Sequence, residues 1–344
     1  MTKSQQLWFT APYAVEIRVQ ELAEPGPDEI LVRTLCSGIS AGTEMLAYRG
    51  QLPRNQPLDS SMEALANQAT NYPLPYGYAS VGRVEAAGDK VDSGMLGRHV
   101  FALQPHATHY LAQAGSVVTL PESMAPEAAL FLANMETAVN LLLDAKPALG
   151  ENVVILGQGV VGLLVTAILS RFPLAGCYVL EPLALRRAKA LVLGADSAID
   201  PASKNAMAAL QSTLDATPGQ GADLVMELTG SPEALNLAVE LCAYSGRIIV
   251  GSWYGNKPVT LDLGGRFHRE RIEIISSQVS SISPELSGRW DRDRRFATAL
   301  AMIEAVRPEQ LITHRLAFGS APEAYQLLDT APETALQAVL TYAD

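Results

Sequence analysis

A short, uninterrupted apolar run in the middle of the chain predicts the element around which one domain is built. Residues 153–156 are four consecutive apolar residues, three of them β-branched, which is typical of a strand buried on both faces of a parallel sheet. A glycine-containing turn follows, and then the largely apolar run 163–169 begins a helix. The pattern predicts a strand, a tight turn and a helix that returns across the sheet.

Strands and helices continue to alternate after this unit. Strand-like runs follow at residues 177–180, 223–228 and 247–251. Between the last two, Ser231 and Pro232 are typical of a helix start, because serine caps helices and proline is favoured in the first turn. Such alternation predicts an α/β fold with a doubly wound parallel sheet.

The N-terminal part of the chain is β-rich instead. Strand-like runs separated by turn residues occur at 14–19, 29–35, 81–88 and 99–103. A helix is expected around Ser61 to Ala69, inside a long polar segment, and the mixed tail after residue 275 most simply rejoins this part. We therefore predict a β-rich domain of residues 1–135 and 276–344, and a domain of residues 136–275 that contains the parallel sheet.

The turn after the central strand has the spacing of a dinucleotide-binding loop, Gly157-Gln158-Gly159-Val160-Val161-Gly162. In that motif the first glycine permits the turn, the second lets the backbone approach a pyrophosphate, and the third lets the helix pack on the strand. The N–H groups at the helix start then point at phosphate. The motif alone is weak, because a tight turn between a strand and a helix often contains glycine.

An acid at a suitable distance strengthens this interpretation. Glu181 ends the next strand-like run, 19 residues after Gly162 (181 − 162), near the spacing of about 20 expected for the acid that binds the ribose diol. A carboxylate there accepts from the 2′-hydroxyl of NAD and repels the 2′-phosphate of NADP. Arg186 and Arg187 would bind such a phosphate if they turn inward; otherwise they are solvated charges on the next helix. We expect NAD or NADP as cofactor, with NAD favoured.

Composition narrows the class of protein further. With 344 residues, 48% hydrophobic, the chain has enough apolar material for two cores, and its net charge of −11 argues against nucleic acid or an anionic membrane as main partner. The N-terminus lacks the apolar core of a signal peptide, and no apolar run approaches the ~18 residues that span a bilayer, so we expect a cytoplasmic protein. Cys36, Cys177 and Cys242 are far apart, which indicates free thiols.

Several motifs together are more specific than the glycine loop. They are S-G-I-S-A-G-T-E at 37–44, G-Y-A-S-V-G-R-V at 77–84, the glycine turn, G-A-D-L-V-M-E at 221–227, G-R-I-I-V-G at 246–251, L-I-T at 311–313 and A-P-E-A-Y at 321–325. On these motifs the chain resembles the medium-chain dehydrogenase/reductase superfamily, of the zinc-type alcohol dehydrogenase-like kind, over nearly its whole length. The first two motifs are most similar to the branch containing bacteriochlorophyllide hydroxyethyl dehydrogenase, although Ala79 stands where that branch usually has an acid. The resemblance implies that the β-rich domain is a GroES-like catalytic and substrate domain and that residues 136–275 form a Rossmann dinucleotide-binding domain.

The departures from the superfamily concern zinc. Its zinc-dependent members have a cysteine at or beside Ser40, a histidine at Tyr78, and a cysteine or acid near Ala133. Catalytic zinc needs three ligands that offer nitrogen, sulfur or carboxylate oxygen. Serine, tyrosine and alanine offer none of these, and no cysteine lies between Cys36 and Cys177 to form the structural zinc lobe. We therefore predict a zinc-free member with no metal site.

Without zinc, another group must protonate the oxyanion formed in carbonyl reduction. By motif position Thr43 matches a hydroxyl that zinc-dependent relatives use in proton relay, and Tyr78 stands where a ligand would face the nicotinamide. Tyrosine, with an ordinary pKa of about 10, is protonated at neutral pH and suits an acid. We predict Tyr78 as donor, Thr43 as relay and His106 as the reserve. The alternatives are a space-filling tyrosine, a turn threonine and a structural histidine.

The resemblance also implies which residues face the nicotinamide half of the cofactor. They are Thr137, Thr229, Gly230, Gly251, Ser252, Trp253, Ser276 and Ser277. Trp253 directly follows the end of a predicted parallel strand, where ligands bind in open α/β sheets. The run Val259 to Leu263 alternates between apolar and polar residues, and we interpret it as an edge strand that pairs across a two-fold axis. Together with family analogy, this strand predicts a homodimer.

These features predict a zinc-independent, NAD(P)-dependent oxidoreductase that transfers hydride between nicotinamide and an alcohol or carbonyl group of a small-molecule substrate. One alternative is an NADPH-dependent enoyl or quinone reductase, against which Glu181 argues. Another is a non-catalytic dinucleotide-binding protein, in which loss of the metal marks loss of chemistry. The sequence does not identify the substrate.

Overall fold

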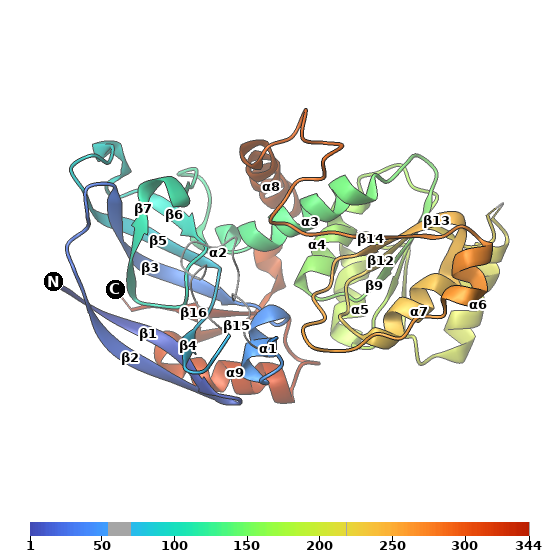
Figure 1. The fold of residues 1–344 in the computed structure, drawn as a ribbon, viewed down its shortest axis with the longest axis horizontal. Coiled ribbons are helices and arrows are strands. Elements are labelled where there is room, and N and C mark those ends of the chain that lie inside the picture. Colours follow the sequence, from blue (N-terminus) through green and yellow to red (C-terminus); the bar gives the residue numbers. More distant parts are fainter. Residues whose placement is uncertain (54–69, 218, 344) are drawn as a thin grey trace. The chain divides into compact units, whose positions relative to one another are not determined.

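The computed structural model describes residues 1–53, 70–217 and 219–343, and the helix expected around Ser61 to Ala69 lies outside them. The chain divides into two compact units, which are Met1–Ala133 with Ile303–Asp344, and Asn134–Met302 (Figure 1). The sequence places the second boundary at residue 275 and the structure places it at residue 302. Residues 276–302 belong to the second unit because they bond to its helices, as described below.

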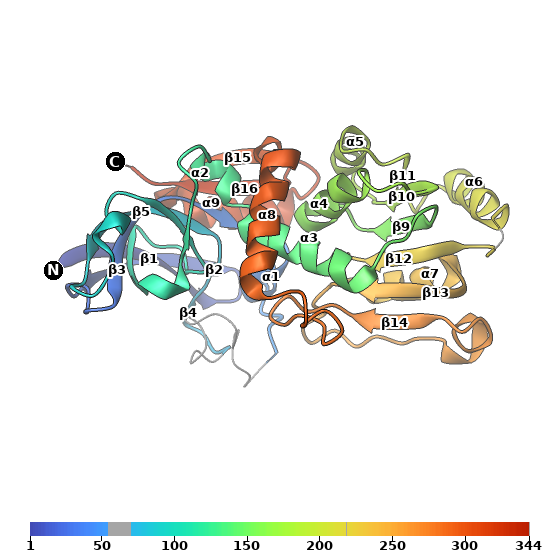
Figure 2. The ribbon, with the colours of Figure 1, turned by 90° about the horizontal axis from the view of Figure 1, so that it is seen from above.

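The second unit is built on a parallel sheet. Its strands are β9 (Asn152–Leu156), β10 (Gly176–Leu180), β11 (Ser197–Ile199), β12 (Ala222–Glu227), β13 (Cys242–Val250) and β14 (Glu273–Ser276). Within the described residues they run in the order β11-β10-β9-β12-β13-β14, all parallel, as Figure 2 shows. This is the 3-2-1-4-5-6 order of the Rossmann fold, so the predicted doubly wound parallel sheet is confirmed.

Helices accompany these strands as the alternating pattern predicts. They are α3 (Leu132–Ala145), α4 (Val160–Leu169), α5 (Ala184–Val192), α6 (Lys204–Asp215), α7 (Pro232–Leu241) and α8 (Arg292–Val306), with the short π-helical segment η3 (Leu263–Phe267). The central strand β9 is covered on both faces, since Val153, Val154 and Ile155 have no exposed surface. Its continuous apolar sequence follows from this burial.

The first unit contains two sheets. Its strands are β1 (Thr2–Ala11), β2 (Ala14–Leu22), β3 (Glu29–Ile39), β4 (Leu74–Pro75), β5 (Ser80–Ala87), β6 (His99–Ala102), β7 (His109–Gln113), β8 (Val118–Thr119), β15 (Ile312–Ala317) and β16 (Gln337–Thr341). In the described part of the chain, one sheet has the order β2-β1-β4 and the other β15-β16-β3-β5-β6-β8, with β7 also paired to β3. Its helices are α1 (Thr43–Tyr48), α2 (Pro126–Ala129) and α9 (Ala321–Thr330).

The C-terminal segment completes the first unit. Strand β16 pairs antiparallel with β3, which places Ala338 opposite Ile39. A core of buried side chains from β1, α1 and α9 includes Phe9, Met45 and Tyr325. Short 3-10 turns complete the connections: η1 (Ser93–Met95), η2 (Ala114–Ser116), η4 (Pro308–Leu311) and η5 (Phe318–Ser320).

The segment expected to form a strand at Val259 to Leu263 is not a strand of the described parallel sheet, whose edge strands are β11 and β14. It is held by Asn236 on α7 instead. The side-chain amide of Asn236 donates to the Thr260 carbonyl at 2.7 Å, and its oxygen accepts from the Asp262 N–H at 3.3 Å. A side-chain amide thus supplies the backbone bonds that a neighbouring strand would supply.

Candidate functional site

The glycine turn has the geometry expected of a loop that admits a phosphate. Gly157 has φ +92°, a left-handed conformation that side chains rarely adopt. A Cβ at Gly162 would lie 2.2 Å from the Gly157 carbonyl oxygen, so the start of α4 packs directly on the turn. A Cβ at Gly159 would meet nothing within 4 Å. The turn therefore leaves open space beside the N-terminus of α4, where Val160 and Val161 begin the helix.

Glu181 joins this turn to the loop after β10. Its carboxylate is buried, with the residue only 3% exposed. One oxygen accepts the Gln158 N–H at 2.8 Å and the other accepts the Leu183 N–H at 3.0 Å. Each carboxylate oxygen keeps a further lone pair for a hydroxyl. The acid is thus fixed beside the glycine turn by backbone bonds.

The two arginines beyond Glu181 differ from each other. Arg187 donates to the carbonyls of Glu181 and Pro182 at 2.7 and 2.6 Å and lies 3.5 Å from a carboxylate oxygen of Asp200. Its guanidinium is engaged by the chain itself. The Nε of Arg186 is buried and has no hydrogen-bond partner among the described residues. Of the two, Arg186 is therefore the one with a buried donor left to offer a phosphate.

A second buried acid, Glu227, organises the carboxyl edge of β12 and β13. One oxygen accepts the N–H groups of Thr229 and Gly230 at 2.7 and 3.2 Å and the Thr229 hydroxyl at 2.5 Å. The other accepts the Tyr254 hydroxyl at 2.8 Å. Burial, and then the negative charge of Glu227, raise the pKa of Tyr254, so its phenol stays protonated and donates.

Five of the residues predicted to face the nicotinamide cluster at this edge, namely Thr229, Gly230, Gly251, Ser252 and Trp253. The Gly230 N–H donates to the Ser252 hydroxyl at 2.8 Å, and the Gly251 N–H donates to the Glu227 carbonyl at 3.1 Å. Trp253, next to them, is 44% exposed. Sequence reasoning missed Glu227 as a site residue. An acid at the end of an otherwise apolar strand was the available signal.

Ser276, Ser277 and Thr137 lie at a second group of polar contacts in the same unit. Ser276 ends β14, and the Ser277 hydroxyl donates to Asp144 on α3 at 2.6 Å. The Asn140 amide donates to Asp144 at 3.0 Å and to the Ser277 hydroxyl at 3.2 Å. The Ser277 hydroxyl is therefore directed at α3, the helix that carries Thr137.

Glu136, beside Thr137, forms a buried ion pair with Arg295 of α8 at 2.7 Å, and Arg295 also donates to Asn140 at 2.7 Å. From the sequence alone, the common position of such a glutamate is the helix surface, but the residue is only 6% exposed. Burial raises the pKa of Glu136 against the opposing effect of Arg295. These bonds hold residues 276–302 in the second unit.

In the first unit, the structure brings Tyr78 and Thr43 to the same serine. The Tyr78 hydroxyl donates to the Ser40 hydroxyl at 2.5 Å, and the Thr43 N–H donates to that oxygen at 3.2 Å. Two of the three positions that the resemblance compares with zinc ligands are thus hydrogen-bonded to each other. Ala133, the third position, is buried and contributes only a methyl group.

His106 lies in a buried cluster behind this serine. Its Nδ1 is 2.7 Å from the Ser37 hydroxyl and its Nε2 is 3.0 Å from Glu44. Glu44 also accepts the Tyr325 hydroxyl at 2.5 Å and the Ser40 N–H at 2.9 Å. His106 and Glu44 have no exposed surface. Burial and the Glu44 charge hold the pKa of Tyr325 well above its usual value, so that it donates to the carboxylate.

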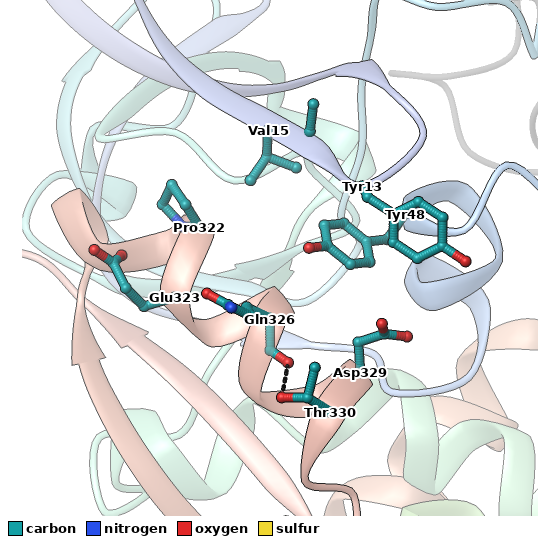
Figure 3. Close-up of a pocket in the computed structure, with 9 residues that line it drawn as sticks. Tyr13, Val15, Tyr48, Pro322, Glu323, Gln326, Asp329 and Thr330 are labelled. Carbon is teal, nitrogen blue, oxygen red and sulfur yellow. Dashed lines mark hydrogen bonds between the residues drawn. The ribbon is translucent and has the colours of Figure 1, made fainter.

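The predicted site residues do not line a pocket of about 510 Å³ in the first unit, which lies between the β1–β2 turn, α1 and α9 (Figure 3). Its lining includes Tyr13, Tyr48, Glu323, Gln326 and Asp329. Within the described residues, no three His, Cys, Asp or Glu side chains are grouped so that they could hold a metal ion. No helix in that part of the chain is long and apolar enough to cross a membrane.

Comparison with known proteins finds a family model and several dehydrogenases that are similar to this chain. The zinc-binding dehydrogenase family model matches residues 160–298. The L-threonine 3-dehydrogenase of Pyrococcus horikoshii is 25% identical over 92% of both chains. The 2-desacetyl-2-hydroxyethyl bacteriochlorophyllide A dehydrogenase of Rhodobacter capsulatus is 28% identical over 99% of both. These matches confirm the predicted resemblance to the medium-chain dehydrogenase/reductase superfamily.

A solved structure agrees on the fold. A short chain alcohol dehydrogenase from Escherichia coli CFT073, complexed with NADH, superposes with a TM-score of 0.80 at 19% identity, over 99% of this chain and all of that one. The predicted GroES-like and Rossmann architecture is confirmed, as is the class of enzyme, a dehydrogenase or reductase of the medium-chain type. The family match at 160–298 does not include Ser40, Tyr78 or Ala133, so it does not bear on zinc.

Proposed function

We propose that this protein is a zinc-independent oxidoreductase that binds NAD or NADP and transfers hydride between the nicotinamide and an alcohol or carbonyl group of a small molecule. The observation that carries the proposal is the Rossmann strand order, with an open glycine turn after β9 and a buried acid after β10. The E. coli relative complexed with NADH has the same fold.

The residues present fit a dinucleotide. The open space at Gly159 and the start of α4 suit a pyrophosphate, and the carboxylate of Glu181 suits a ribose diol. When bound, the nicotinamide supplies the hydride chemistry, and the chain positions it and moves the proton. Glu181 favours NAD. The buried Nε of Arg186 is the feature that would favour NADP.

We propose that Tyr78 gives the proton to the alkoxide as a carbonyl is reduced, with Thr43 as relay or orienting partner. The hydrogen bond from Tyr78 to the Ser40 hydroxyl supports this, since it holds the phenol in place, and the backbone N–H of Thr43 on the same oxygen puts Thr43 beside it. His106 is enclosed between Ser37 and Glu44, which favours a role in holding Glu44 over direct proton transfer.

Zinc independence is supported by the donor chemistry of Ser40, Tyr78 and Ala133, which offers two neutral hydroxyls and a methyl group. Protein purified without added zinc should contain well under one zinc per chain. One zinc per chain, lost together with activity on chelation, would contradict the proposal.

The function is tested by calorimetric titration with NADH and NADPH, followed by a screen of secondary alcohols, ketones, quinones and alkenals. We expect tighter binding of NADH and turnover of an alcohol or carbonyl substrate. Binding of neither cofactor would refute the proposal. Binding without turnover of any class would favour a non-catalytic protein, and turnover of alkenals or quinones with NADPH would favour an enoyl or quinone reductase.

We also propose that the protein is a homodimer formed through the second unit. The position of β14 at the edge of the sheet within the described residues supports this, because a sheet edge needs covering or pairing. Light scattering should give twice the chain mass of 36.7 kDa. A monomer mass at micromolar concentration would contradict it.

A further inference from the structure

Glu227 ends a central strand with its carboxylate fully buried. Burying a charge is costly unless hydrogen bonds compensate it. Here four donors do so: two backbone N–H groups and the hydroxyls of Thr229 and Tyr254. Hydrogen bonds from N–H groups to an ionised carboxylate are stronger than neutral ones, so the local backbone is held firmly.

These bonds tie together two loops that are separate in the sequence. Thr229 and Gly230 begin the loop after β12, and Tyr254 lies in the loop after β13. Lys257, in the second loop, donates from Nζ to the Gly230 carbonyl at 2.8 Å. Two sets of hydrogen bonds thus clamp the two loops together: those that the buried Glu227 accepts from both loops, and the one from Lys257 to Gly230. Trp253 lies in the clamped part and is 44% exposed.

The position of Glu227 mirrors that of Glu181. Strands β10 and β12 flank β9 on either side, and each ends in or is followed by a buried glutamate that accepts backbone N–H groups of a loop at the carboxyl edge. In a Rossmann sheet a dinucleotide lies across this edge, with its two halves on opposite sides of the central strand. Glu181 is on the side of the adenosine half, so Glu227 is on the side of the nicotinamide half.

We propose that Glu227 is a positioning residue that presets the nicotinamide half of the cofactor site, acting through Thr229, Gly230 and Tyr254. This rests on the proposed function, since it assumes a nicotinamide dinucleotide. Loops that are already ordered lose less conformational entropy when a ligand binds. Removal of the clamp should therefore weaken binding of the nicotinamide half of the cofactor and leave binding of the adenosine half unchanged.

The test compares two ligands in calorimetry, NADH and ADP-ribose, which lacks the nicotinamide. Glu227→Gln keeps the shape but removes the charge, and its amide group can no longer accept on both sides. We expect the dissociation constant for NADH to rise roughly tenfold, while that for ADP-ribose stays within about twofold. Tyr254→Phe removes only one hydrogen-bond donor and should raise the dissociation constant for NADH about threefold.

Two exposed positions provide matched controls. Glu240→Gln on α7 and Tyr244→Phe in β13 make the same chemical changes outside the clamp and should leave both ligands unaffected. Thermal unfolding of each variant checks its fold, and Tyr254→Phe carries the test if Glu227→Gln does not fold.

The outcomes separate this inference from the proposed function. Unchanged NADH binding by folded variants, or equal weakening of NADH and ADP-ribose, would overturn the positioning role alone. Failure of the wild-type protein to bind NADH, NADPH or ADP-ribose would overturn the proposed function as well.

Discussion

Each unit contains a glutamate with no exposed surface, and the two are held in different ways. Glu227 in the second unit takes three of its hydrogen bonds from Thr229 and Gly230, two and three residues further along the chain. Glu44 in the first unit lies against His106 and Tyr325, which are 62 and 281 residues away. Glu227 shapes two loops at one edge of a sheet, whereas Glu44 joins segments that lie much further apart in the sequence.

The difference predicts different consequences of mutation. Loss of the Glu227 carboxylate disturbs a loop at the proposed cofactor edge and leaves the sheet intact. Loss of the Glu44 carboxylate leaves buried donors on two other elements without a partner, which costs stability. The predictions below compare the two units in this way, beginning with the largest expected effect.

Tyr78→Phe tests the chemistry proposed for the first unit. The variant removes a hydroxyl and keeps the ring, so turnover of an identified substrate should fall by roughly 10² to 10⁴. Cofactor affinity, which belongs to the second unit, should not change. Steady-state kinetics and calorimetry measure the two effects. Near-normal turnover would mean that Tyr78 only fills space beside Ser40.

Glu44→Ala tests the role of the distant contacts. The change leaves His106 and Tyr325 as buried groups without their acceptor, so the free energy of unfolding should fall by about 3 kcal/mol. Urea denaturation measures it. As control, Glu85→Ala removes the partially exposed ion pair with Arg33 and should cost under about 1 kcal/mol. Equal losses for the two variants would show that the buried cluster adds no special stability.

Glu181→Gln tests the cofactor preference of the second unit. The neutral side chain no longer repels a 2′-phosphate, so any gap between NADH and NADPH affinity should narrow by roughly tenfold. Stability should change little compared with Glu44→Ala. If the wild-type protein already binds NADPH more tightly than NADH, Arg186 dominates and the assignment of Glu181 is wrong.

The smallest effect that we expect is a pH dependence of stability caused by the three buried cysteines, which occur in both units. Burial raises the pKa of Cys36, Cys177 and Cys242 from 9.0 to about 12. The folded state therefore binds protons that the unfolded state releases, and stability from this source is full below pH 9 and lost as the pH rises towards 12. A thiol reagent at pH 8 should label the native protein slowly and the unfolded protein at all three sites. Rapid labelling of a native thiol would show that its burial is incomplete.

The Rossmann unit was predictable because its signals are local. An apolar run and a glycine turn act within a few residues, and the alternation of strands and helices predicts a doubly wound parallel sheet. The 3-2-1-4-5-6 order itself comes from the structure. Residues 276–302 were placed in the other domain because the Glu136–Arg295 pair that holds them joins positions 159 residues apart. Sequence spacing carries no information about such a pair.

The sequence by itself determined the fold class, the glycine turn with Glu181, and the hydroxyl and methyl groups at the three positions that the resemblance compares with zinc ligands. Only the tertiary structure decided that Tyr78 donates to Ser40, that His106 is enclosed beside Glu44, and that Glu227 clamps two loops. The physical reason is the range of the interactions. Helix and turn preferences depend on neighbours in the chain, whereas a buried carboxylate must take its donors from whichever segments the packed core brings to it.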